Sequence, residues 1–137
     1  MSHALSFTQP TLVGRSRSGV VALWFVQIAL AGMFVLAGGS KLLGAPAMVT
    51  LFNTIGVGQW FRYVTGIIEV GSAIALLVPS LAVFGALALV PTMIGAVATE
   101  LLIVGDSAIP PAVLLLGAIG IVWARRDQLI SALSIAR

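Results

Sequence analysis

In residues 64–104 the chain reads VTGIIEVGSAIALLVPSLAVFGALALVPTMIGAVATELLIV, a run of 41 residues whose only charges are Glu69 and Glu100. A carboxylate near the centre of a bilayer costs about 2.5 to 3.5 kcal/mol even on lenient insertion scales. Such a side chain therefore faces the protein interior, takes up a proton or finds a cation. We expect the function of the protein to involve these two positions.

The length of this run predicts two membrane helices. As one helix it would measure about 61 Å, which is twice the hydrocarbon thickness of a bilayer. The run must fold back on itself, and the turn signal near its middle is Pro79 followed by Ser80. We place the two helices at residues 61–78 and 81–104.

Two further apolar runs flank this pair of helices. Residues 20–39 carry no charge and are long enough for a first membrane helix. A cleaved signal peptide is the competing interpretation, because two arginines, an apolar run and small residues follow one another in that order. A last apolar run predicts a helix at residues 108–124. With 60% hydrophobic and 8% charged residues, the whole chain has the composition of a multi-pass membrane protein.

The predicted fold is all-α: a bundle of four transmembrane helices in a membrane domain of residues 20–126. Apolar residues at helical spacing between Pro46 and Ile55 predict a short interfacial helix between the first and second spans. Residues 1–19 would form an N-terminal arm, and residues 127–137 a short amphipathic tail.

The distribution of positive charge orients this bundle. Four spans place both termini on one side of the membrane, and five arginines flank that side against Lys41 and Arg62 on the other. The positive-inside rule predicts that both termini are cytoplasmic. Because these cations are scattered along the ends of apolar stretches, we expect a lipid bilayer and no nucleic acid as the partner.

Four charged side chains should meet in the outer half of the bundle: Lys41, Arg62, Glu69 and Glu100. Either cation could hold Glu69 ionised, with Glu100 as a second titrating group. Two carboxylates that share a low-dielectric site with a cation suit proton exchange with a ligand such as a quinone. The alternative is that the same residues form a static salt bridge that fixes the packing of the helices.

The sequence lacks the residue types that some kinds of chemistry require. The chain has no cysteine, which excludes disulfides, thiol redox chemistry and thiolate-bound metals. Its single histidine, His3, lies in the N-terminal arm, so we expect no metal site. No intrinsic cofactor is expected.

Several short motifs resemble the DoxX and DoxX-like membrane proteins. The first span closes on Leu36, Ala37 and Gly38 followed by Lys41 and Leu42, and the sequence continues with Phe52, with residues 56–60 and with Gly66, Glu69 and Gly71. The resemblance covers residues 20–126 and implies a four-helix bundle in a bacterial inner membrane. The family takes its name from a relative of the small membrane subunit of a thiosulfate:quinone oxidoreductase. Where similar members often have a histidine after the threonine of the third span, this chain has Glu100 after Thr99, which puts any histidine-dependent role in doubt here.

Three hypotheses follow. The first is an accessory or quinone-interacting component of a membrane oxidoreductase system, which works with a redox partner protein and is not a complete redox enzyme alone. The second is a purely structural membrane subunit. The third is a proton-coupled carrier of a small solute, which would need to form a homo-oligomer to line a path.

Overall fold

A computed structural model describes residues 16–136, and this part of the chain consists of helices joined by turns. The all-α prediction is confirmed for it. The elements are α1 (Arg17–Leu42), α2 (Pro46–Ile55), α3 (Gln59–Leu77), α4 (Ala82–Thr99), η1 (Glu100–Val104), α5 (Ile109–Ala124) and α6 (Arg126–Ile135). Element η1 is a π-helical continuation of α4.

Helix α1 is longer than the predicted span of residues 20–39. It begins at Arg17 because the side chain of Ser16 accepts a hydrogen bond from the backbone N–H of Gly19, at 3.2 Å. It ends only after Lys41, at Leu42. Residues 17–19 of the predicted N-terminal arm therefore belong to α1, and residues 1–15 lie outside the described part of the chain.

The other helices begin and end within two residues of their predicted limits. Helix α3 occupies Gln59–Leu77 where we predict residues 61–78, and α4 with η1 occupies Ala82–Val104 where we predict residues 81–104. Helix α5 begins one residue later than expected and ends at the predicted Ala124. The C-terminal tail folds as α6.

Three of these helices are long and apolar enough to cross a membrane: α1, α3 and the continuous Ala82–Val104. Helix α5 has only 16 residues and meets the same test only together with α6, from which it is bent by 56°. The protein is therefore an apolar, helical membrane protein with three to four candidate spans. The sequence argument for four spans counts α5 as a full span, although its helix breaks at Arg125.

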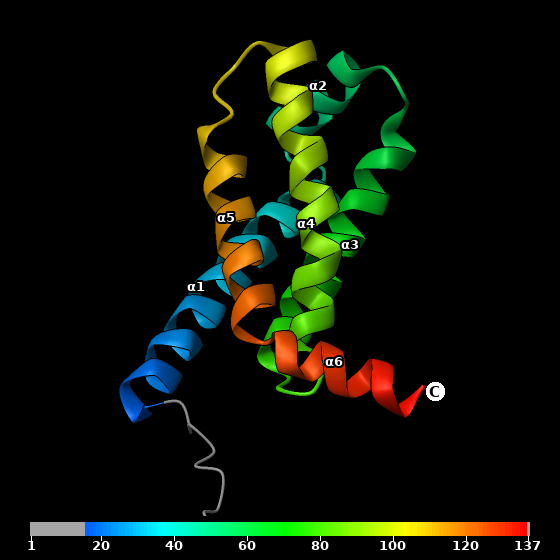
Figure 1. Ribbon diagram of the computed structural model, residues 1–137. Coiled ribbons are helices and arrows are strands. Elements are labelled where there is room, and N and C mark those ends of the chain that lie inside the picture. Colours follow the sequence, from blue (N-terminus) through cyan, green and yellow to red (C-terminus); the bar gives the residue numbers. More distant parts are fainter. Residues whose placement is uncertain (1–15, 137) are drawn as a thin grey trace, which may run out of the picture.

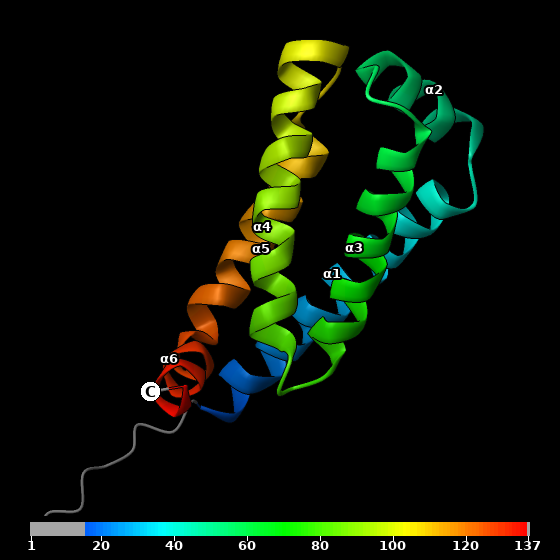
Figure 2. The ribbon, with the colours of Figure 1, turned by 90° about the vertical axis from the view of Figure 1, so that its right-hand side faces the viewer.

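The long helices contact one another in a closed order: α1 with α3, α3 with α4, α4 with α5, and α5 with α1. Figures 1 and 2 show that the short α2 lies at one end of this arrangement, whereas the start of α1 and all of α6 lie at the other. Contacts with α1, α3 and η1 hold α2 in place. Because α2 has only 10 residues, it measures about 15 Å and is too short to span a bilayer.

The core is small and consists mainly of aliphatic side chains, with Phe34 as its largest member. It is formed by Leu30, Ala31, Phe34, Ala73, Leu76, Ala86, Leu89, Met93, Ala118 and Ile121. Large apolar side chains such as Leu102 and Leu116 point outward, where they would face lipid.

A buried glutamine connects three helices at the end opposite α2. Gln27 of α1 is fully buried, and its amide donates a hydrogen bond of 2.7 Å to the carbonyl of Leu76, near the end of α3. Its carbonyl oxygen accepts a bond of 2.6 Å from Nε of Arg125, at the junction of α5 and α6. Carbonyls in the last turn of a helix lack partners within that helix. Gln27 thus satisfies one of them and holds Arg125 at the same time.

Replacing Gln27 by leucine is expected to lower the free energy of unfolding by about 1 to 3 kcal/mol, because the buried carbonyl of Leu76 and the partly buried Arg125 each lose a hydrogen bond. Thermal unfolding in detergent micelles, followed by circular dichroism, measures this change. Thr54→Val is the control, since its exposed hydroxyl bonds only to the carbonyl of Thr50 in the same helix. Equal stability of the two variants would contradict the role given to Gln27.

Candidate functional site

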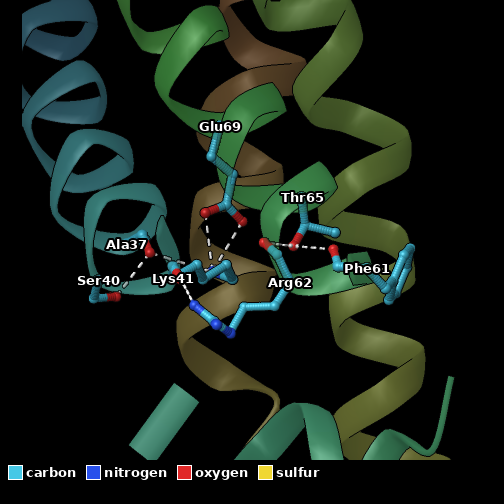
Figure 3. Close-up of polar contacts among 7 residues, drawn as sticks. All are labelled: Ala37, Ser40, Lys41, Phe61, Arg62, Thr65 and Glu69. Atoms are coloured by element: carbon cyan, nitrogen blue, oxygen red, sulfur yellow. Dashed lines mark hydrogen bonds and ion pairs between the residues drawn. The ribbon is translucent and has the colours of Figure 1, made fainter. Parts of the chain in front are cut away.

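A buried ion pair joins the end of α1 to the middle of α3. The ammonium of Lys41 lies 2.9 Å from Oε2 and 3.1 Å from Oε1 of Glu69 (Figure 3). The side chain of Lys41 is 14% exposed and that of Glu69 only 3%. Burial of two opposite charges is tolerated when they pair with good geometry, as they do here.

Two glycines allow the backbones to come close enough for this pair. Gly38 of α1 and Gly66 of α3 face each other, and a Cβ atom on Gly38 would lie 2.9 Å from the carbonyl oxygen of Gly66. The same atom would lie 2.8 Å from Cγ2 of Val70. Close approach through small residues is typical of helix packing in membranes. Lys41 follows Gly38 by one turn, which places its ammonium beside Glu69.

Arg62 lies next to this pair and does not join it. Its Nη1 donates a hydrogen bond to the backbone carbonyl of Lys41, and its Nε donates one of 2.7 Å to Oε1 of Gln59. The guanidinium also lies 4.3 Å from the centre of the Tyr63 ring. Arg62 is 5% exposed and stabilises the end of α1. Of the two cations that the sequence offers to Glu69, the structure pairs it with Lys41.

Next to the ion pair lies a cavity of about 690 Å³, lined by residues of α1, α2, α3, α4, η1 and α5. Apolar residues form most of the lining. They include Phe34, Phe52, Phe61, Met48, Met93 and Leu114. Its polar side chains are Lys41, Thr65, Glu69, Thr92, Thr99 and Glu100. Three of the four predicted site residues therefore line one cavity, and Arg62 is the one that does not.

Glu100 differs from Glu69 because its carboxylate has no hydrogen-bond or ion-pair partner among the described residues. It is the first residue of η1, and its Oε2 is buried without a hydrogen bond to any described residue. The backbone carbonyl of Glu100 accepts the N–H of Gly105, at 2.8 Å, which closes the π-helical turn. Single π-helical turns within membrane or soluble helices are frequent at functional sites. Because Glu100 lines the cavity, its unpaired carboxylate can accept a hydrogen bond from a ligand.

Sequence reasoning missed part of this cavity. It did not include the hydroxyls of Thr92 and Thr99, nor the wall that α2 and the start of α5 contribute. The signal for the threonines is present, because Thr92, Gly95 and Thr99 recur at helical spacing and so share one face of α4 with small side chains. The wall from α2 depends on tertiary packing.

Among residues 16–136, no group of three or more histidine, cysteine or acidic side chains lies together in a way that could hold a metal ion. The polar chemistry of the described site thus consists of the ion pair, Glu100 and three hydroxyls.

Comparison with known proteins adds one finding. A family model described as the DoxX-like family matches residues 25–123, which include the ion pair, Glu100 and all of the cavity lining. Searches among curated proteins and among solved structures found no significant match.

Proposed function

Because this chain belongs to the DoxX-like family, we propose that this small membrane protein is an accessory, quinone-interacting component of a membrane oxidoreductase system. The observation that carries the proposal is the cavity of about 690 Å³ with an apolar wall and charged groups in its lining. Ligand pockets are commonly about 300 to 1,000 Å³ and combine apolar walls with a few polar groups that fix orientation. A lipophilic ring compound with polar oxygens matches this lining, because its apolar surface suits the wall and its oxygens suit the charged groups.

The chain's own residues have distinct roles in this proposal. Phe52 and Phe61 would contact the ring and tail of a quinone. The Lys41–Glu69 pair would set the electrostatic field at the polar part of the cavity. Glu100 would accept a hydrogen bond from the ligand. Electrons would come from, or pass to, a redox partner protein.

The placement in the membrane belongs to the same proposal. We place the protein in a bacterial inner membrane with four spans, the fourth made of α5 completed by the first turn of α6. Helix α2 would lie at the outer interface. Both termini would be cytoplasmic, because Arg17, Arg125 and Arg126 lie at the end opposite α2.

Binding of decyl-benzoquinone to the protein in lipid nanodiscs tests this function, with binding to empty nanodiscs subtracted. We expect saturable binding of one molecule per chain. Gly95→Leu should weaken it at least tenfold, since Gly95 lines the cavity and a Cβ atom there meets nothing within 4 Å. The side chain would therefore fill space that the ligand needs.

Gly120→Leu is the matched control. Gly120 is also exposed on a helix with nothing within 4 Å of an added Cβ atom, but it lies on α5 outside the cavity lining. Its binding should equal that of the unaltered protein. Absence of saturable binding both of the quinone and of its reduced hydroquinone form, or equal binding by both leucine variants, would contradict the proposal.

A structural role is the second candidate, and the ion pair favours it. Both carboxylate oxygens of Glu69 are satisfied by Lys41, so the pair could serve only to fix the crossing of α1 and α3. This role predicts that variants of the pair lose stability while the cavity binds no quinone.

A further inference from the structure

The ammonium of Lys41 has no hydrogen left for a ligand. It carries three N–H donors. Two of them donate to Oε2 and Oε1 of Glu69, and the third donates to the carbonyl oxygen of Ala37, at 3.5 Å (Figure 3). A ligand that needs a donor from Lys41 would have to break the buried ion pair.

The three hydroxyl groups of the lining also donate their hydrogens within the protein. Thr65 donates to the backbone of its own helix, at the carbonyls of Phe61 and Arg62. Thr92 donates to Ala88 O at 2.9 Å, and Thr99 donates to Gly95 O at 2.8 Å. A hydroxyl has one hydrogen to donate, so what these threonines still offer to the cavity is lone pairs.

The backbone adds few donors, because the lining contains three prolines. Pro91 lies within α4, and Pro110 and Pro111 form the start of α5. A helix start is ordinarily rich in free N–H groups, but proline has none. The neighbouring N–H groups of this turn are used: that of Ile109 donates to Oγ of Ser107, and that of Ala112 donates to Ala108 O.

One charged acceptor in the lining has no hydrogen bond. Glu100 lines the cavity, and neither oxygen of its carboxylate receives a hydrogen bond within residues 16–136. The side chains of the cavity therefore present the unpaired carboxylate of Glu100 and, in the described structure, no unused N–H or O–H. A ligand that donates a hydrogen bond completes this site, whereas a ligand that only accepts finds no partner.

We propose that the cavity selects the reduced, hydroxyl-bearing hydroquinone over the oxidised quinone, with a hydroquinone O–H donating to Glu100. This inference rests on the proposed quinone function and specifies which form the site binds. A hydroquinone has two O–H donors, while a quinone has only carbonyl acceptors. A carbonyl oxygen of the quinone would lose its hydrogen bonds to water and lie beside the lone pairs of a carboxylate, with no donor to replace those bonds.

Binding of decyl-hydroquinone and decyl-benzoquinone to the protein in nanodiscs, compared under argon, tests the preference. We expect the hydroquinone to bind at least tenfold more tightly. In Glu100→Gln, which keeps the size of the side chain and adds a donor, the preference should fall below threefold. Asp106→Asn is the control, because Asp106 is an exposed acid in the loop after η1 and should leave the preference unchanged.

A second measurement needs no variant. Tighter binding of the reduced form raises the midpoint potential of the bound couple, and each tenfold preference corresponds to about 30 mV for two electrons. Equal binding of both forms, tighter binding of the quinone, or an unchanged preference in Glu100→Gln would overturn this inference and leave the proposed function standing. If neither form binds, the proposed function fails together with it.

Discussion

Replacing Lys41 by methionine should lower the free energy of unfolding by about 3 to 5 kcal/mol, which is the usual cost of removing one member of a buried ion pair. The side chain of Glu69 is 3% exposed, and both of its oxygens accept hydrogen bonds from Lys41. Without the ammonium, a buried carboxylate remains with no cation beside it, because Arg62 is engaged with Gln59 and the carbonyl of Lys41. Thermal unfolding in nanodiscs, compared with the unaltered protein, measures the loss.

The double variant Lys41→Met with Glu69→Met separates the cost of an unpaired charge from the value of the pair. Apolar residues of similar volume often replace a buried ion pair without loss. We expect the double variant to lie within about 1 kcal/mol of the unaltered protein. Arg17→Met, an exposed cation at the start of α1, is the control for loss of positive charge. If the double variant were as unstable as the single one, the attraction between Lys41 and Glu69 would itself hold α1 to α3, and the loss in Lys41→Met would not come from an unpaired charge.

The variant Gly38→Leu should destabilise the protein by about 3 kcal/mol or more, at the upper end of the usual cost of overpacking. Its first side-chain atom alone would lie 2.8 Å from Val70 Cγ2, 2.9 Å from Gly66 O and 3.0 Å from Glu69 Cβ. One of these contacts is with backbone, which cannot rotate away. Helices α1 and α3 would have to separate, and the Lys41–Glu69 pair would lengthen with them.

The neighbouring Gly39→Leu is the matched control for this change. A Cβ atom at Gly39 meets nothing within 4 Å, and the position lies in the same helix. It should change the free energy of unfolding by no more than about 0.5 kcal/mol. Unfolding in nanodiscs compares the two variants, and quinone binding in the same samples should be lost only in Gly38→Leu. Similar stability of both variants would contradict the close crossing at Gly38.

The course of the main chain could be predicted from sequence because membrane helices depend on local properties. Apolar length, the turn at Pro79 and the helix start at Pro46 are each visible in a few neighbouring residues. Helical spacing in the sequence places Glu69 on one face with Gly66 and Ala73, and the structure buries all three. That inference needs only the 3.6-residue period of the helix.

The details of the site depend on contacts between distant segments, which a single sequence does not specify. The sequence leaves open whether Lys41 or Arg62 pairs with Glu69, since both lie at the same end of the bundle. The answer depends on Gln59 and on the carbonyl of Lys41, which together engage Arg62. The π-helical turn at Glu100 and the cavity beside it likewise arise from how α2, η1 and α5 pack.

The unequal lengths of α1 and α5 bear on the lipid around the protein. With 16 residues, α5 measures about 24 Å, less than a hydrocarbon core of about 30 Å. Helix α1 has 26 residues and measures about 39 Å. In the four-span arrangement proposed above, the first turn of α6 adds little to the length of α5, because α6 is bent by 56° from it. The bilayer would then become thinner beside α5, whereas α1 would accommodate its excess by tilting. In that arrangement the protein would impose a thickness gradient on its surroundings, and lipids with shorter acyl chains would fit the α5 side better than longer ones.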